Sequence, residues 1–257
     1  MSARRTGTTA VNVRQARHPR QPTAWPPVPP APAVHPYFTA QTADLPTAQW
    51  KMDETSGTTM ADSSGNGHDG TYAGGLSLAS TVGDFTAPHF VNDSAKHAVI
   101  ANGAWMNAVT SAITLEGLYY ADTFPAAACL FGMSGAFPQK LAMYWASQAN
   151  GPACYLGTSS NDYYTGGLGP AGVTGAWYHI AASYDQTPEK FRVYINGTQV
   201  IEMTARGTLN NWGQSVYVGR QPGGTGPWDG YLAGLGWYQT PLSAARILAH
   251  AQAAGLA

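Results

Sequence analysis

Few residues of this chain have the types and spacing that catalysis requires. The glutamates Glu116, Glu189 and Glu202 stand apart from other acids, and only Glu54 has an acidic neighbour, Asp53. Hydrolysis of a glycosidic bond needs two carboxylates about 5–10 Å apart, which on a strand means acids at i and i+2 or i+4 on one face. Adjacent strand residues point to opposite faces, so Asp53 and Glu54 do not form such a pair. We therefore expect no catalytic residues and no enzymatic activity.

Metal and cofactor motifs are incomplete. Asp62, Ser64, Asn66 and Gly67 match the first half of a calcium loop, but Ala73 stands where the bidentate glutamate should close it. Asp62 and Asn66 remain candidate calcium ligands, although hydrogen bonds within a tight turn also explain these residues. The histidines lack zinc-binding spacing. The glycines of residues 65–70 match a dinucleotide fingerprint, but no helical pattern follows to receive a pyrophosphate. No cofactor is expected.

Aromatic residues beside Gly, Asn or Asp are the main lead toward a binding function. A sugar site needs an aromatic face for the ring C–H groups and a few polar groups that fix the hydroxyls. The candidate glycan-contact residues are Trp212, Trp228, Asp229, Asn211, Tyr163 and Tyr164. Sandwich folds also bury tryptophans, so Trp212 and Trp228 are equally compatible with the core, where Trp145 and Trp177 are expected. Cys129 and Cys154 are expected to be buried free thiols.

The elements that would position these residues are short strands. Alternation and turn residues predict strands at 48–52, 98–101, 113–120, 128–132, 141–145, 177–184, 191–195, 198–201, 216–219 and 231–238. Asn196-Gly197 between two of them is a strong hairpin signal, because both turn residues need positive φ. Residues 55–70 have the composition of turns. A single helix is expected over about 243–254, with Ser243 as its N-cap and Gly255 as its C-terminal stop.

The first 46 residues differ from the rest. This segment is rich in proline and arginine, has Asp44 as its only acid, and should form an extended arm. The candidate docking residues of the arm are Arg4, Arg5, Arg14, Arg17, Arg20 and Trp25. Prolines interrupt the region where a secretory signal would need an apolar run, and no stretch is long enough to span a membrane. The net charge of −1 gives no reason to expect nucleic acid as a partner.

Several motifs in order resemble a known family. The segments Trp50 to Tyr72, Trp177 to Asp185, Phe191 to Val200, Val216 to Arg220 and Trp228 to Ser243 are similar to laminin-G-like domains of the concanavalin A-like lectin/glucanase type. The resemblance implies an all-β, two-sheet antiparallel jelly-roll sandwich over residues 47–257. One departure is that Ala233 and Gly234 stand where the family usually has an acidic pair. Some members use acidic loop residues to hold calcium, so this difference argues against a metal.

The resemblance and the arm together suggest a function. Such domains ordinarily act outside cells, but the sequence shows no secretory signal. Release by cell lysis as part of a virus particle would reconcile the two, so we expect a non-enzymatic structural protein of a bacteriophage virion, of the minor tail or head-decoration type. It would be assembled in the host cytoplasm as part of an oligomer, with the arm docked on other virion subunits and the sandwich exposed toward host-surface carbohydrate. The alternatives are a free carbohydrate-binding module or lectin, and a glycan hydrolase.

Overall fold

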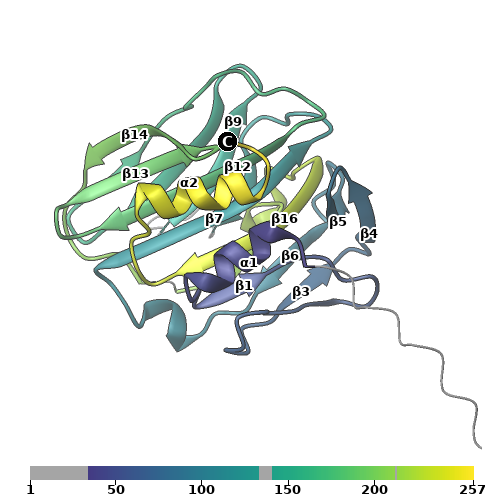
Figure 1. The fold of residues 1–257 in the computed structure, drawn as a ribbon, viewed down its shortest axis with the longest axis horizontal. Helices are drawn as coiled ribbons and strands as arrows, with labels where there is room; N and C mark the ends of the chain where they lie inside the picture. The colour runs from purple at the N-terminus through teal and green to yellow at the C-terminus, as the bar shows by residue number, and fades with distance from the viewer. Residues whose placement is uncertain (1–33, 133–140, 212) are drawn as a thin grey trace, which may run out of the picture. The chain divides into compact units, whose positions relative to one another are not determined.

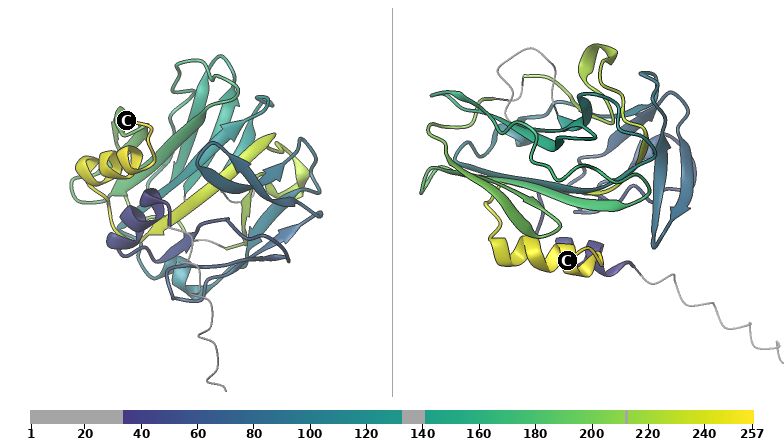
Figure 2. Two further views of the ribbon diagram at one scale, coloured as in Figure 1. Left: turned by 45° about the vertical axis from the view of Figure 1, so that its right-hand side comes forward. Right: turned by 90° about the horizontal axis from the view of Figure 1, so that it is seen from above.

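The computed structural model describes residues 34–132, 141–211 and 213–257. Two antiparallel sheets pack face to face, and two helices lie together on the outer face of one of them (Figures 1 and 2). The predicted all-β sandwich with a C-terminal helix is confirmed. The predicted docking residues Arg4, Arg5, Arg14, Arg17, Arg20 and Trp25 lie outside the described residues.

Sheet one carries both helices. In spatial order its strands are β14 (Thr198–Thr204), β13 (Lys190–Ile195), β12 (Trp177–Asp185), β7 (Ala112–Ala121), β16 (Gly230–Tyr238), β5 (Phe85–Phe90) and β4 (Ser77–Val82), and β1 (Ala48–Trp50) pairs with the second half of β16. The long central pair β7–β16 has an irregularity between Ala233 and Gly236. At this bulge the Gly234 carbonyl points toward a helix.

Sheet two forms the other layer. Its strands, in spatial order, are β11 (Asp162–Tyr164), β10 (Gly151–Gly157), β9 (Leu141–Ser147), β8 (Ala128–Gly132), β15 (Val216–Val218), β6 (His97–Ile100), β3 (Gly70–Ala73) and β2 (Thr59–Met60). Two short 3-10 helices, η1 (Ala104–Asn107) and η2 (Pro222–Gly224), lie in connections. Residues 55–70 are mostly turns and bends, as predicted; they contain the two-residue strand β2, and β3 begins at Gly70.

The core fills the space between the sheets. Side chains alternate along each strand, so one set points inward and the other outward. The inward set includes four fully buried tryptophans, namely Trp50, Trp145, Trp228 and Trp237. Both cysteines are buried and free, which confirms the prediction for Cys129 and Cys154. Burial raises the pKa of both thiols, so neither is a reactive nucleophile.

Helix α2 (Ala244–Ala253) begins and ends where the sequence predicted. The Ser243 hydroxyl accepts a hydrogen bond from the Arg246 amide at 3.3 Å, which satisfies a donor that the first turn leaves free. At the other end Gly255 has φ +74°, a conformation that glycine adopts without steric cost. The apolar Ile247 is buried against sheet one.

Helix α1 (Pro36–Ala43) corrects the predicted domain boundary. Residues 36–46 were expected to belong to an extended arm, but the folded unit begins at Val34. Pro36 occupies the first helical turn, where its missing N–H costs nothing. Tyr37 and Phe38 are buried in a cluster with Phe85 of β5. Proline content indicated an extended chain, but aromatic burial against sheet one determines the observed structure.

In the described part of the chain, no helix is long and apolar enough to cross a membrane.

The β13–β14 hairpin supports helix α2 and generates a stability prediction. Asn196 and Gly197 have φ +48° and +75°, the two positive values that the sequence predicted. A β-carbon at Gly197 would also lie 2.7 Å from the Leu248 side chain and 3.2 Å from that of Ala251, both on α2. The turn therefore touches the helix directly.

We expect Gly197→Ala to destabilise the fold more than Gly57→Ala. Gly57 has φ +91° with nothing within 4 Å of an added β-carbon, so its substitution isolates the conformational cost of about 1–2 kcal/mol. Gly197→Ala should add roughly 1–3 kcal/mol for overpacking. Urea denaturation of both variants measures the difference. Equal losses would mean that the hairpin does not press against α2.

Candidate functional site

The outer face of sheet one is divided into a covered and an uncovered part. Strand register places outward side chains of β12, β7 and β16 in rows across the sheet: Glu116 beside Ala181 and Gly236, Leu118 beside His179 and Ala233, and Tyr120 beside Trp177 and Tyr231. Glu116, Leu118 and His179 are fully or almost fully buried, whereas Tyr120, Trp177 and Tyr231 are half-buried. The helices α1 and α2 thus cover the sheet up to the row of Tyr120.

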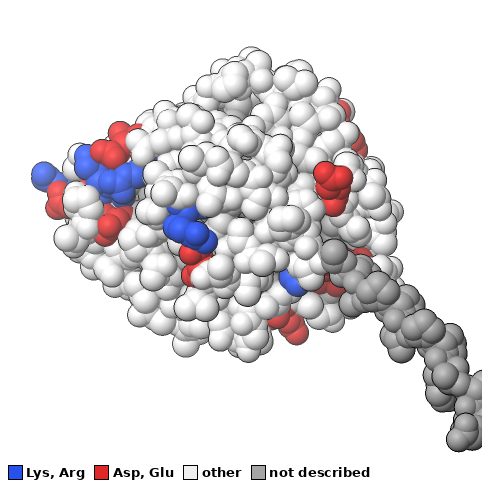
Figure 3. Space-filling model, in the orientation of Figure 1, with Lys and Arg blue, Asp and Glu red and all other residues white. Residues whose placement is uncertain are grey.

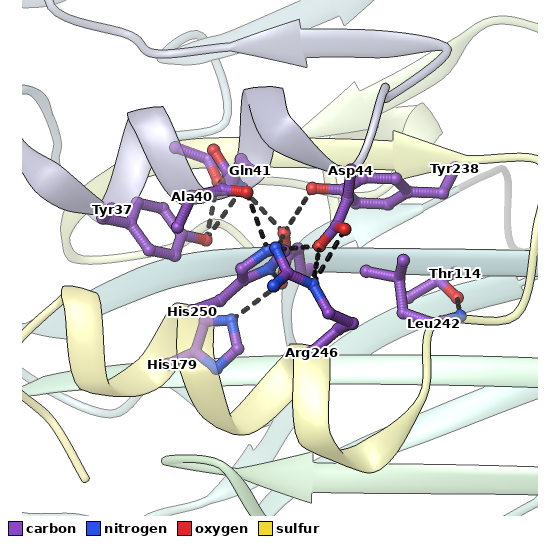
Figure 4. A network of polar contacts seen from close by, with 12 residues as sticks. Tyr37, Ala40, Gln41, Asp44, Thr114, His179, Tyr238, Leu242, Arg246 and His250 are labelled. Carbon is purple, nitrogen blue, oxygen red and sulfur yellow. Dashed lines mark hydrogen bonds and ion pairs between the residues drawn. The ribbon is translucent and has the colours of Figure 1, made fainter.

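A buried carboxylate joins the helices to the sheet (Figure 4). Glu116 of β7 accepts hydrogen bonds from His179 Nε2 at 2.9 Å, Tyr238 Oη at 2.7 Å and Gln41 Nε2 at 3.0 Å. His250 Nδ1 of α2 lies 3.0 Å from both Glu116 oxygens. Complete burial opposes ionisation, but the bonds from the two histidines hold the pKa of Glu116 well below its ordinary value.

Both ring nitrogens of His250 face acceptors. Nδ1 meets Glu116, while Nε2 lies 3.1 Å from the Ala40 carbonyl and 2.8 Å from Asp44 Oδ2. A neutral imidazole can donate from only one nitrogen, so this geometry requires the doubly protonated cation. Burial lowers the pKa of His250, but Glu116 and Asp44 outweigh it and the net shift is upward. Arg246 Nε completes the network with two 2.8 Å contacts to Asp44, so two cations balance two carboxylates.

The helix α1 explains the departure from the family pattern at Ala233 and Gly234. The Gly234 carbonyl accepts bonds from Tyr37 Oη at 3.0 Å and Gln41 Nε2 at 2.8 Å. A β-carbon at Gly234 would lie 2.4 Å from the Tyr37 ring, and Ala233 is fully buried beneath the same helix. An acidic pair cannot occupy these positions while α1 is packed on the sheet.

The uncovered row is aromatic. His89 of β5 stacks on Tyr231 of β16, with ring centres 4.5 Å apart and planes 13° from parallel. Tyr231 contacts Tyr120 of β7 at 5.6 Å, and Tyr120 contacts Trp177 of β12 at 5.4 Å. We call these four side chains the aromatic row. Trp177 was expected in the core, but it lies on the outer face because its register position points outward, and Nε1 donates to the Val82 carbonyl at 2.9 Å.

Polar groups flank the aromatic row. His89 Nε2 lies 2.8 Å from Asp122 Oδ2, and Asp122 follows β7 directly after the row. Asp229, which precedes β16, accepts hydrogen bonds from Thr123 Oγ1 and from the Asn92 amide. Tyr120 and Tyr231 are half-buried and each carries a phenol hydroxyl, which can both donate and accept a hydrogen bond. The row therefore combines ring surface with hydroxyls and carboxylates that can exchange hydrogen bonds with a ligand.

Charge is unevenly distributed over this face. Figure 3 shows basic and acidic side chains together over β13 and β14, where Lys190 and Arg192 both pair with Glu202. The surface over β4 and β5 carries mostly uncharged and some acidic side chains. A ligand bound there would therefore contact few charged side chains.

The predicted glycan-contact residues fall in different places. Trp228 is a core residue with no exposed surface, so its prediction as a contact residue is corrected. Its amide donates to the Gly219 carbonyl at 2.8 Å, and its ring packs beside Trp145 between the sheets. Asp229 lies beside the aromatic row. Trp212 lies outside the described residues.

Three candidates gather at the edge of sheet two. Tyr163 and Tyr164 are on the edge strand β11, and the exposed Asn211 follows Asn210, whose amide donates to the Gly157 carbonyl. Tyr164 is 58% exposed, but Tyr163 Oη already accepts a bond from the Arg206 amide at 2.8 Å. This edge patch presents one open ring, whereas the aromatic row presents four rings in contact.

The candidate calcium ligands are used by the protein itself. Asp62 accepts hydrogen bonds from the amides of Gln49, Ser64 and His68, each at 2.9 Å, and from the Ser64 hydroxyl. Although partial burial acts the other way, these bonds hold the pKa of Asp62 below its ordinary value. Asn66 Nδ2 donates to the Thr47 carbonyl at 3.0 Å. Among the described residues, no group of three or more His, Cys, Asp or Glu side chains is placed to hold a metal ion.

The sequence pattern did not reveal the aromatic row or the buried network. Tyr120, Tyr231 and His89 come from three strands whose pairing the sequence does not specify. Glu116 lies in an apolar strand without a neighbouring acid, and its two histidine partners are 63 and 134 residues away in the sequence. The single available signal was an ionisable residue inside a run of apolar residues, since such a residue must be paired when buried.

The network predicts a stability maximum at mildly acidic pH. The contribution of Glu116 is present above its ordinary pKa of 4.5 and is lost as the pH falls through its lowered value. The contribution of His250 is complete below 6.5 and is lost as the pH rises through its raised value. The groups facing His250 are Glu116, Asp44, the Ala40 carbonyl, Tyr37 and Tyr238, and Arg246 shares Asp44 with it.

We therefore expect His250→Gln to cost about 2–4 kcal/mol near pH 6, because it leaves buried carboxylates without their cation. This cost should shrink as the pH rises to 9. The matched control Tyr238→Phe removes a different hydrogen bond to Glu116 and should cost the same amount throughout that range. Urea midpoints at a series of pH values provide the measurement, and a pH-independent cost for His250→Gln would contradict a cationic His250.

Comparisons with known proteins identify the fold family. The family model described as the concanavalin A-like lectin/glucanases superfamily matches residues 92–248. No curated protein matched the sequence.

Among solved structures, domain 4 of AbnA, an extracellular arabinanase from Geobacillus stearothermophilus solved with arabinotriose, has a TM-score of 0.63 at 20% identity, covering 80% of this chain and 98% of that one. The binding domain of Paraclostridial Mosquitocidal Protein 1 has a TM-score of 0.61 at 12% identity, over 80% of this chain and 52% of that one. A structure of botulinum neurotoxin type C, whose cell entry depends on two ganglioside molecules, has a TM-score of 0.61 at 10% identity, over 85% and 53%.

At these identities the solved structures establish a shared fold. The family match covers more than half of the chain and agrees with the observed two-sheet sandwich. The chain belongs to the concanavalin A-like lectin/glucanases superfamily.

Proposed function

We propose that the sandwich binds carbohydrate without cleaving it, and that the aromatic row is the binding surface. The observation that carries this proposal is the continuous contact of His89, Tyr231, Tyr120 and Trp177 across four neighbouring strands. Strands lie about 4.8 Å apart, so the row is roughly 14 Å long, enough for a short oligosaccharide. Sugar rings present C–H groups that pack on aromatic surface and hydroxyls that need polar partners.

The polar neighbours fit the same ligand. The carboxylates of Asp122 and Asp229 accept hydrogen bonds, and the phenol hydroxyls of Tyr120 and Tyr231 can both donate and accept. Asp122 is 39% exposed and His89 28% exposed, so a ligand can reach both. The proposal also draws support from two proteins with this fold. The arabinanase domain was solved with arabinotriose, and the cell entry of the neurotoxin depends on gangliosides.

The way in which the acids are held supports binding without cleavage. Glu116 is buried in the network below the helices and cannot meet a ligand. Asp122 and Asp229 both reach the surface near the row, but each is already engaged with a neighbouring side chain, His89 and Thr123 respectively. After long incubation with bound oligosaccharides, we expect no new reducing ends. The formation of new reducing ends would establish a hydrolase instead.

We expect Tyr231→Ala to weaken oligosaccharide binding about two- to twelvefold, since one aromatic contact contributes roughly 0.5–1.5 kcal/mol. Arabinotriose and cello-, xylo- and galacto-oligosaccharides are the probes, with affinities measured by calorimetry. Tyr164→Ala at the edge patch is the matched control and should bind like the parent protein. The reverse pattern would move the site to the edge of sheet two, and no binding of any probe would remove the carbohydrate proposal.

We further propose that the domain is displayed by a bacteriophage virion, with residues 1–33 docked on other virion subunits. The composition of this segment supports the proposal: it contains all five N-terminal arginines, many prolines and no acid. Arginine donates up to five hydrogen bonds in a fixed geometry and suits binding to carbonyls and carboxylates at interfaces. The helix α1 then joins the docking segment directly to the sandwich.

The docking proposal predicts a difference between the full chain and residues 34–257 in affinity capture from lysate of infected host cells. The full chain should retain capsid or tail subunits identified by mass spectrometry, and the shorter chain should not. A full-length variant with the five arginines of residues 1–33 replaced by glutamine separates the role of charge from that of length. Capture of no virion subunit by the full chain would exclude this role, leaving a free carbohydrate-binding module.

A further inference from the structure

Arg220 occupies an unusual position at the end of β15. Its Nη2 donates a hydrogen bond to His97 Nε2 at 3.0 Å, and its Cζ lies 5.1 Å from the centre of the Tyr217 ring. His97 Nδ1 is 2.8 Å from the Ala95 carbonyl, so this nitrogen carries the proton and Nε2 is free to accept. Burial, together with the charge of Arg220, lowers the pKa of His97 and keeps it neutral. The two neighbours orient the guanidinium without neutralising it.

The positive charge of Arg220 has no carboxylate partner. The other three arginines of the described region each pair with an acid: Arg192 with Glu202, Arg206 with Glu189 and Arg246 with Asp44. All fourteen acidic residues of the sequence lie in the described part, and none of its ion pairs involves Arg220. The Nε–H is moreover buried without an acceptor. A half-buried charge left in this state is costly unless another group compensates it.

Two loops of small residues adjoin the guanidinium. Gly223 and Gly224 both have positive φ, and a β-carbon at Gly224 would lie 3.3 Å from Arg220 Nη1 and 3.4 Å from the Ser94 side chain. The one acid of the neighbouring loop, Asp93, accepts a bond from the Ala95 amide at 2.9 Å within its own turn. Gly224 and Ser94 thus lie near Nη1, and no ion pair links Asp93 to Arg220.

We propose that Arg220 is a binding site for the anionic group of an acidic saccharide, a carboxylate or a sulfate ester. Arginine binds planar and tetrahedral oxyanions through paired N–H donors, and Tyr217 and His97 hold the guanidinium in one orientation. Arg220 follows β15 of sheet two, whereas the aromatic row lies on sheet one. The choice of a saccharide as carrier rests on the carbohydrate-binding proposal.

The test uses the full chain with trigalacturonate as the carboxylate probe, a sulfated galacto-oligosaccharide as the sulfate probe and galactotriose as the neutral control. The Arg220 Nε–H resonance should shift on addition of an anionic probe and stay unchanged with the neutral one. Arg220→Gln should weaken anionic binding roughly ten- to a hundredfold, as expected for a lost charge-assisted pair. Arg220→Lys should restore part of it. Arg206→Gln, which removes the same charge from an exposed pair, should have no effect.

The proposal is wrong if neither anionic probe shifts the Nε–H resonance at saturating concentration, or if Arg220→Gln binds them as tightly as the parent protein. The resonance is read in the unmodified chain, so the result does not depend on the variants folding. Failure here is distinguishable from failure of the carbohydrate proposal, because binding of neutral probes at the aromatic row depends on Tyr231 and not on Arg220.

Discussion

The burial of Glu116 is the constraint on which the arrangement of this molecule depends. A carboxylate on the outer face of a central strand is stable there only if it is paired and fully hydrogen-bonded. The protein meets this requirement with groups from four elements: His179 of β12, Tyr238 of β16, Gln41 of α1 and His250 of α2. The two helices are consequently fixed to the sheet by polar contacts as well as by apolar packing.

The position of the helices determines which part of the sheet can bind a ligand. They end short of the row formed by Tyr120, Tyr231 and Trp177, which remains half-exposed. Their packing also accounts for the small residues Ala233 and Gly234, because Tyr37 occupies the space that larger side chains would need. The packing of the helices over Glu116 thus accounts for three features together. These are the local change from the family pattern, the folded N-terminal helix and the location of the aromatic row.

The sequence predicted the strands whose alternation and turn residues agree, such as β12, the β13–β14 hairpin and the capped helix α2. It did not predict β4, β5 or β10, where small and polar residues obscure the alternation, nor α1, where prolines upstream suggested an extended chain although Tyr37 and Phe38 are buried. The candidate contact residues were chosen by local composition, which placed Asp229 beside the aromatic row but also selected Trp228, a core residue. Sites formed across paired strands depend on register, and register depends on contacts between residues far apart in sequence.

The central claim is that His250 is a buried cation between Glu116 and Asp44, while His179 Nε2 donates a hydrogen bond to the same glutamate. Nitrogen-15 NMR of the histidine side chains tests this most directly, since it reports the protonation of each ring nitrogen. At pH 7 both ring nitrogens of His250 should carry protons, and Nε2 of His179, which donates to Glu116, should carry one. A neutral His250 at pH 7, or a His179 protonated only on Nδ1, would contradict the account of how the helices are held on the sheet.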